Sequence, residues 1–179
     1  TLVIDSHVTL RAGAERVEVE TTVYNVAEDH RLRVLLPSGA RAAATWLADT
    51  PFDVVERPIA LRGDNHRYRE LEVETKSQLT WSAVYDGAQG LAVVSSGLLE
   101  SAVRDQPERP LALTLLRSTR RTVFTDGEPA GQLLGALHFR FWIAPLAAAP
   151  DPVELCRLGQ QLAAGLRTVQ LRPADVAQL

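Results

Sequence analysis

The sequence predicts an all-β domain, a large antiparallel β-sandwich that carries one short helix near its C-terminal end. Runs in which apolar and polar residues alternate return along most of the chain, and this period of two is typical of half-buried strands. Glycine and proline clusters separate these runs at the short intervals that antiparallel connections require. About ten such runs and a single helical pattern favour two stacked antiparallel sheets.

The first two strands are expected at residues 2–10 and 16–24. The connection at 12–15 is short enough to join them as a hairpin. Each strand has an apolar face that we expect to point inward, opposite a polar face. The apolar residues are Leu2, Ile4, Val8 and Leu10 in the first strand and Val17, Val19 and Val23 in the second.

The next part of the chain predicts three strands and a loop. Pro37 and Pro51 end two apolar runs, because proline cannot donate to a central strand. Leu71 and Val73 alternate with three glutamates, which predicts a strand with a solvated acidic face. The strands are expected at 32–36, 42–47 and 69–75, and the loop at 57–69.

A central hairpin is expected at residues 79–95. Its two apolar runs flank the connection at 86–90, where Gly87 and Gly90 are both expected to supply the positive φ of a tight reversal. Trp81 stands in the first of these runs and Trp46 in an earlier one, so both are expected in the core. Two further strands are predicted at 111–116 and 137–143.

One helix is expected after Asp151. Asp151 is suited to the N-cap, Pro152 to the first helical position, and Gly165 lies near the expected end. Four leucines spaced three or four residues apart form one apolar face of this helix. They are Leu155, Leu158, Leu162 and Leu166, and a last short strand is expected at 168–171.

Four segments of the chain carry distinctive motifs. They are N-V-A-E-D-H-R-L-R-V-L-L-P at 25–37, A-D-T-P-F-D-V-V-E-R at 48–57, D-G-A-Q-G-L-A-V-V-S-S-G-L-L-E at 86–100 and L-A-L-T-L-L-R-S at 111–118. Together, and in this order, they resemble the C-terminal β-domain of the glycoside hydrolase family 38 α-mannosidases. The resemblance implies a supersandwich of the kind that supports carbohydrate-active enzymes.

Composition limits the classes of partner. A net charge of −3, with acidic and basic residues interspersed and aromatics at 6%, offers no basic stripe or stacking platform for nucleic acid. No apolar run approaches the ~20 residues of a membrane-spanning helix. A single cysteine, Cys156, forms no internal disulfide, which favours the cytoplasm. We therefore expect neither nucleic acid nor a membrane as a partner.

The start of the chain indicates a segment of a longer protein. The sequence has no methionine, and Thr1 leads directly into strand-like sequence. At 179 residues and 46% hydrophobic residues the chain suits one globular domain. We expect residues 1–179 to be a single β-sandwich domain of a longer α-mannosidase chain.

We expect no catalytic residue, no metal site and no cofactor within the chain. The four histidines stand on separate elements and lack the short spacings that build a metal site. The glutamates at 70, 72 and 74 are better explained as a solvated face than as a glycosidase pair, and Asp64 to His66 as a turn. The resemblance implies that the carboxylate nucleophile and the zinc ligands lie in an N-terminal catalytic domain.

Two arginines in the first motif are candidates for an interface or a substrate contact. Arg31 and Arg33 share one side of a strand start, where they could clamp a carboxylate or bind a sugar hydroxyl. Structural pairing inside the sandwich is the favoured alternative. Trp142 projects opposite Phe139 and Phe141, which makes it the aromatic candidate for an interface or a sugar contact.

The segment at 117–132 is too long for an ordinary hairpin connection. Arg117, Arg120 and Arg121 follow directly on a predicted strand, where arginines can hold carboxylates or hydroxyls. In the family the corresponding region turns toward the catalytic domain, so the resemblance implies an interface there. A solvated basic loop is the alternative.

These observations predict a function for the chain as part of a larger enzyme. It resembles the non-catalytic C-terminal domain of a retaining, zinc-dependent α-mannosidase, which would brace the catalytic domain and lend a loop to the cleft that binds a mannose-containing glycan. The alternatives are a free-standing carbohydrate-binding sandwich and a structural module. A parent chain with several hundred upstream residues would distinguish the first hypothesis from the other two.

Overall fold

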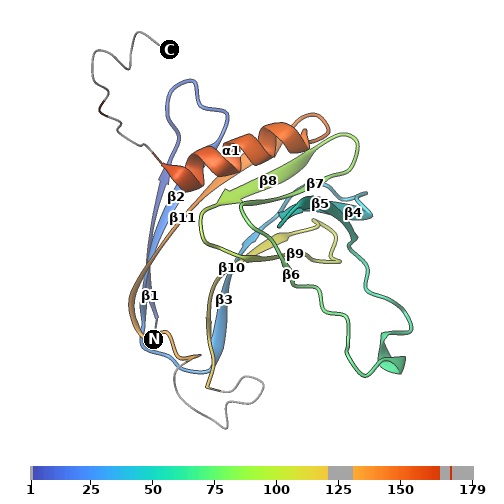
Figure 1. The fold of residues 1–179 in the computed structure, drawn as a ribbon, viewed down its shortest axis with the longest axis horizontal. Coiled ribbons are helices and arrows are strands. Elements are labelled where there is room, and N and C mark those ends of the chain that lie inside the picture. The colour runs from blue at the N-terminus through green and yellow to red at the C-terminus, as the bar shows by residue number, and fades with distance from the viewer. Residues whose placement is uncertain (1, 121–130, 166–169, 171–179) are drawn as a thin grey trace.

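The computed structural model describes residues 2–120, 131–165 and 170. Within these ranges the chain forms two antiparallel sheets and one α-helix, in three layers (Figure 1). Arg121 lies outside the described residues, as does the strand predicted at 168–171 except for Gln170. The predicted class, an all-β sandwich with one short helix, is confirmed.

Seven strands form the larger sheet and four form the smaller one. All the strand pairs are antiparallel. The larger sheet has the spatial order β1 (Val3–Thr9), β2 (Val17–Asn25), β11 (Gly135–Leu146), β8 (Gly90–Ser95), β7 (Trp81–Tyr85), β4 (Thr45–Thr50) and β5 (Asp53–Pro58). The smaller sheet has the order β3 (His30–Leu36), β10 (Leu111–Ser118), β9 (Glu100–Val103) and β6 (Lys76–Ser77).

Two apolar cores hold the layers together. The first lies between the sheets and includes Trp46 and Phe141. The second lies on the other face of the larger sheet and includes Trp81 and Trp142, under the helix α1 (Pro152–Ala164). Trp46 is 3% exposed and Trp81 is fully buried, so their predicted core positions are confirmed.

Helix α1 begins and ends as the sequence predicts. The Asp151 carboxylate accepts hydrogen bonds from the backbone of Val153 (2.8 Å) and Glu154, and Gly165 caps the last turn with a φ of 64°. Leu155 is buried and Leu158 and Leu162 pack beside it, so these three leucines of the predicted stripe point to the sheet. Leu166 lies outside the described residues. The helix lies on the larger sheet, on the side away from the smaller one, and covers the second core (Figure 1).

The first hairpin has the predicted strands, but its outer strand is not buried. Ile4 and Val8 stand in register with the buried Val23 and Val19, so they lie on the inner face as expected. All seven residues of β1 are nevertheless exposed. The expectation of burial was wrong because β1 is the edge strand of the larger sheet.

The strand predicted at 69–75 is not formed. The amide of Asn65, in the short 3-10 helix at Asn65–Arg67, donates to the carbonyl of Glu72 (2.8 Å), and its oxygen accepts from the Glu72 N–H (2.7 Å). These bonds hold the segment in an irregular path. Leu71 and Val73, predicted to face inward, are 61% and 56% exposed. The turn expected around Asn65 is confirmed.

Part of the loop predicted from residue 57 is a strand, since β5 extends to Pro58. β5 pairs with β4, and the two are joined by a tight connection in which Phe52 has a φ of 77°. This connection also places β4 three residues later than predicted, at Thr45–Thr50. The hairpin was hidden because Phe52 is an unusual residue for a positive φ.

The central hairpin is formed by β7 and β8, with Asp86 to Gln89 as its connection. Gly87 has the expected positive φ, 97°, but Gly90 does not have one. Gly90 is required for another reason: a Cβ atom there would lie 2.1 Å from the carbonyl oxygen of Val84. The expectation of a positive φ at Gly90 was therefore wrong. A close approach of another backbone segment and a tight turn both require glycine, so the sequence alone does not distinguish them.

Candidate functional site

The outer face of the smaller sheet brings together three of the predicted arginines. Leu32, Val34 and Leu36 of β3 pack into the first core, so Arg31 and Arg33 point outward. Arg117 on β10 stands directly opposite Arg31 in the register. With Arg104, which follows β9, these residues form what we call the arginine face: Arg31, Arg33, Arg104 and Arg117.

A β-bulge puts Arg117 on this face. The register between β10 and β3 shifts between Thr114 and Leu116, so two residues of β10 oppose one of β3. Leu111 and Leu113 point into the core, and uninterrupted alternation would send Arg117 the same way. The extra residue reverses the alternation, and Arg117 points outward with 53% of its side chain exposed.

Glu100 joins two of these arginines. Its Oε2 lies 2.7 Å from Arg117 Nη2, and its Oε1 lies 3.7 Å from Arg31 Nη1. The Thr114 hydroxyl donates to the same carboxylate at 2.7 Å, and Arg31 donates to the hydroxyl of Thr75 at 3.1 Å. Structural pairing, the favoured alternative for Arg31, is thus present.

Arg33 is the least satisfied member of the arginine face. Its Nη1 is buried and has no hydrogen-bond partner among the described residues. Burial lowers the pKa of Arg33, and the charges of Arg31 and Arg104 lower it further, against the opposite effect of Glu74 and Glu100. Four guanidinium groups thus face two carboxylates, since Glu74 in turn pairs with Arg104 at 3.4 Å.

Arg120 lies apart from this cluster. Its Nη2 is 2.6 Å from a carboxylate oxygen of Glu28, and its backbone N–H donates to Asp29 at 2.8 Å. This backbone bond and one from the side chain of Gln132 lower the pKa of Asp29 despite some desolvation. Arg120 therefore ties the segment after β10 to the connection between β2 and β3.

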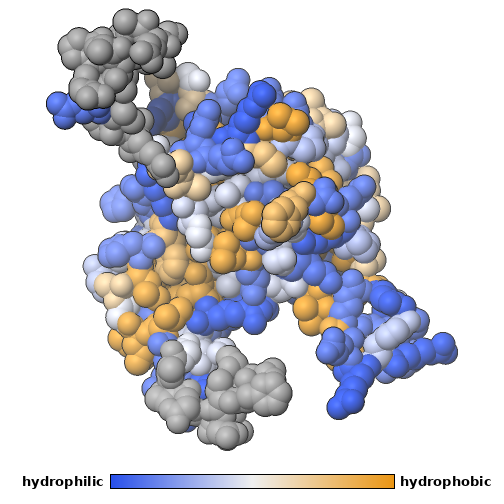
Figure 2. Space-filling model, viewed as in Figure 1, coloured by the Kyte–Doolittle hydropathy of each residue, from blue (hydrophilic) through white to orange (hydrophobic). Residues whose placement is uncertain are grey.

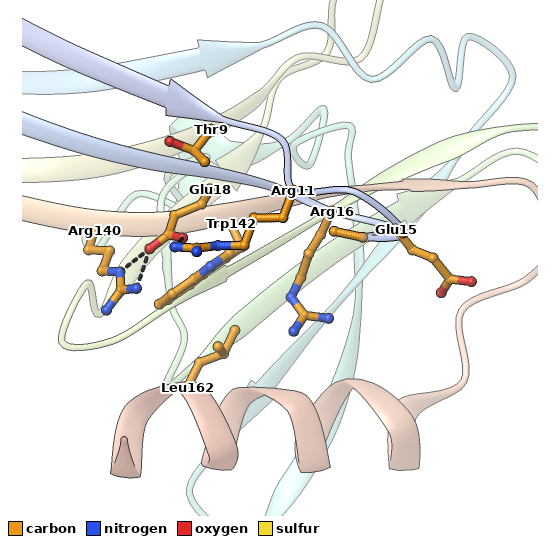
Figure 3. A pocket seen from close by; sticks show the side chains of 10 residues that line it. Thr9, Arg11, Glu15, Arg16, Glu18, Arg140, Trp142 and Leu162 are labelled. Atoms are coloured by element: carbon orange, nitrogen blue, oxygen red, sulfur yellow. Dashed lines mark hydrogen bonds and ion pairs between the residues drawn. The ribbon is translucent and has the colours of Figure 1, made fainter. Parts of the chain in front are cut away.

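A second candidate site lies on the helical side of the molecule. A cavity of about 520 Å³ opens between the β1–β2 connection, β11 and α1 (Figure 3). The carboxylate of Glu18, with 10% of its side chain exposed, binds Arg11 at 3.3 Å and also pairs with Arg140. Burial alone would raise the pKa of Glu18, but hydrogen bonds and charge from the two arginines hold it below its usual value.

Trp142 lies at the floor of this cavity, and its ring is covered by neighbouring groups. It points to the face opposite Phe141, as predicted, but α1 covers it and it is 5% exposed. The guanidinium of Arg140 occupies one ring face, 4.8 Å from the centroid. This packing leaves no open ring face on which a pyranose could stack.

Several residues of these two sites were not singled out from the sequence. Glu100 ends the S-S-G-L-L-E motif, and a charged residue among apolar neighbours was a usable signal. Arg104 offered none, because ordinary alternation places charged residues at such positions. Glu18 was expected with Glu20 on a solvated sheet face, and this expectation was wrong for Glu18, which is 8% exposed. Their roles depend on contacts between segments that are far apart in sequence.

The described residues contain no group of three or more His, Cys, Asp or Glu side chains that could hold a metal ion. Among the helices of the described residues, none combines the length and apolar character needed to cross a membrane.

The two stacked antiparallel sheets, with one helix on the larger sheet, define an all-β sandwich domain. The family model for the "Glycosyl hydrolases family 38 C-terminal domain" matches residues 2–128. The chain belongs to this family.

Relatives in the same family are much longer than this chain. A Halalkalibacterium halodurans protein named "Putative mannosylglycerate hydrolase" is 27% identical over 175 residues, which is 86% of this chain and 18% of the relative. An alpha-mannosidase from Enterococcus faecalis V583 has a similar structure, with a TM-score of 0.73, 27% identity and coverage of 90% of this chain and 17% of its own. Another family 38 structure from Enterococcus faecalis gives a TM-score of 0.69 at 27% identity, again over 90% of this chain and 18% of the other.

Proposed function

We propose that residues 1–179 are one non-catalytic domain of a longer, retaining α-mannosidase, and that this domain braces the catalytic domain. The names of the two relatives with a stated activity, a mannosylglycerate hydrolase and an alpha-mannosidase, both refer to mannose. This supports a mannose-containing glycan as the substrate of the parent protein. The chain spans 17% and 18% of its relatives, which supports a parent with a separate catalytic part. A cytoplasmic location is part of this proposal.

The observation that carries the bracing role is the uncovered inner face of β1. Ile4 is 47% exposed, and Val8 and Leu10 are each 67% exposed, although the first two stand in register with buried core residues. This apolar face continues the core beyond the smaller sheet. Ser6 stands between Ile4 and Val8 on this face, and exposed apolar side chains grouped around it in this way are typical of an interaction site. We propose that another part of the parent protein covers it.

Catalysis and zinc binding are assigned to that other part of the parent. The three half-buried or buried glutamates of the two candidate sites are each engaged by arginines. A glycosidase instead needs one carboxyl group free to give a proton and a second free to attack or to activate water. When bound in the catalytic domain, zinc would supply charge stabilisation for the substrate.

The first test compares the isolated chain with its parent. The isolated chain should hydrolyse no aryl α-mannoside and should retain no stoichiometric zinc. The parent should hydrolyse the mannoside and should retain zinc.

In the parent, Val8→Asp should lower the thermal midpoint, because a charge would enter an apolar interface. Thr9→Asp, on the adjacent exposed position of the same strand, is the matched control. Hydrolysis by the purified chain, or equal midpoints for the two variants, would contradict the proposal.

We further propose that the segment at 117–132, of which residues 121–130 lie outside the described residues, is the domain's contribution to the catalytic-domain interface, with Arg117 as its most important residue. In the parent, Arg117→Ala should lower kcat/KM about tenfold to a hundredfold, the equivalent of a charge-assisted contact worth ~1.5 to 3 kcal/mol. Arg41→Ala is the control, because Arg41 is also exposed and paired with one glutamate. Unchanged kinetics in a folded Arg117 variant would leave the bracing role alone.

A further inference from the structure

The arginine face has more positive charge than its own glutamates can balance. Arg31 and Arg117 are direct cross-strand neighbours, an arrangement in which like charges destabilise a sheet. Arg33 lies beside Arg31 on the same strand, and Glu74 and Glu100 are the carboxylates that act on it. Among the residues that the structure describes, four guanidinium groups against two carboxylates leave two positive charges over. Like charges placed opposite each other conflict with the usual pairing preferences of a sheet, and such conflicts are expected at functional sites.

The accessible donors of this face belong to Arg31 and Arg117. Their side chains are 36% and 53% exposed, and both already turn toward Glu100. Arg33 and Arg104 add charge from deeper positions, since Arg33 Nη1 is buried and the Arg104 side chain is 29% exposed. Two exposed guanidinium groups above two deeper ones are suited to a planar anion that accepts paired hydrogen bonds.

This face borders an open hollow. The projecting segment at 59–75 stands beside the smaller sheet (Figure 1). Figure 2 shows a notch open to solvent next to this segment. Thr75, at the end of the projecting segment, contacts Arg31 at 3.1 Å. A ligand group in the notch would therefore reach the exposed arginines from the side opposite α1.

We propose that the arginine face is a carboxylate-binding site, in which Arg31 and Arg117 donate to the ligand and Arg33 and Arg104 supply additional charge. The carboxylate comes either from an acidic side chain in the rest of the parent protein or from an acidic group on the substrate. The second source depends on the proposed function, whereas binding itself does not.

Binding is tested on the chain with malonate, whose two carboxylates match the two unbalanced charges. Affinity is measured by titration calorimetry in a chloride background of equal ionic strength, because screening alone affects exposed charges. Arg31→Gln and Arg117→Gln should each weaken binding about tenfold or more. Arg41→Gln, which changes an exposed arginine that is paired with a glutamate outside the arginine face, should leave it unchanged.

Glu100→Gln separates a binding site from a structural ion-pair cluster. This change keeps an acceptor for Thr114 but removes the charge that competes for Arg31 and Arg117. If the site binds carboxylates, malonate should bind severalfold more tightly to the variant. Absence of malonate binding by the unmodified chain would overturn the proposal, as would unchanged binding by both arginine variants. Weaker binding by a folded Glu100 variant would do the same.

The parent protein distinguishes the two sources. If its own acidic side chain occupies the site, the parent should not bind malonate there, and Arg31→Gln should lower its thermal midpoint. If the substrate supplies the carboxylate, the parent should bind malonate, and malonate should inhibit hydrolysis of a mannoside with a carboxylated aglycone. Either result supports the site, and a lack of mannosidase activity in the parent would refute the proposed function without affecting malonate binding by the chain.

Discussion

Replacement of Asp49 by alanine should destabilise the fold more than any surface substitution. Asp49 lies on β4 and is 7% exposed. Its carboxylate accepts hydrogen bonds from the backbone of Thr80 (2.9 Å) and Trp81 (2.9 Å) and from the Thr80 hydroxyl (2.6 Å). It also accepts one from Leu79 at 3.1 Å. This one side chain therefore holds the start of β7 against β4.

The size of the effect follows from which donors lose their partner. The Leu79 N–H also bonds to the Asp49 carbonyl at 3.1 Å, so it stays satisfied. The N–H groups of Thr80 and Trp81 do not, and Trp81 is fully buried. Each buried donor left without a partner costs about 1 to 3 kcal/mol, so the loss of two partners in Asp49→Ala should cost about 2 to 6 kcal/mol. Asp49→Asn keeps one acceptor oxygen and should cost about half as much.

Urea denaturation followed by tryptophan fluorescence measures this difference, with an unchanged m-value as the sign that the native state is intact. Asp5→Ala is the control, since Asp5 is exposed on the edge strand β1, and its effect should stay within about 0.5 kcal/mol. A loss below about 1 kcal/mol for Asp49→Ala would refute the reasoning, because it would mean that water or a backbone shift satisfies both donors.

Three further changes test the packing and the acid sensitivity of the fold. Gly90→Val should cost about 3 kcal/mol or more through a clash with a strand carbonyl, whereas Gly63→Ala, with open space around it, should change the denaturation midpoint little. Gly159→Ala should also destabilise, because its Cβ would lie 2.1 Å from a threonine hydroxyl on the sheet, although alanine favours helix. The lowered pKa of Glu18 stabilises the fold above its ordinary value of 4.5, and this contribution is lost as the pH falls through the lower native value. Glu18→Gln should therefore flatten the fall of the urea midpoint between about pH 5 and about pH 3.

The sequence alone was sufficient to predict an element when its local signals, such as caps and alternation, agreed with the face that the element buries. The alternation around Val19 and Val23 predicted β2, and the combination of Asp151, Pro152 and Gly165 predicted α1 with its caps. The family motifs led to the right fold because the segments 86–100 and 111–118 contain β8 and β10, which are inner strands of the larger and the smaller sheet respectively.

Other features were out of reach because they depend on contacts between distant segments. The amide of Asn65 holds Glu72 in an irregular segment, and this bond overrides the alternation at 69–75. The bulge in β10 turns Arg117 outward, although alternation alone would bury it. Trp142 is covered by a helix that follows it in the chain, and the period of its strand does not reveal this cover.

The two incomplete surfaces of the domain face the same way. The inner face of β1 points to the side on which the smaller sheet lies, and the arginine face points away from the larger sheet on that same side. Helix α1 covers the opposite side of the larger sheet and packs on the apolar face beneath it. One partner that approaches from the side of the smaller sheet would thus meet both the exposed side chains Ile4 and Val8 and the unbalanced arginines. An apolar contact beside a charged one would fix the orientation of such a partner, because burial supplies the attraction and the arginines select a carboxylate.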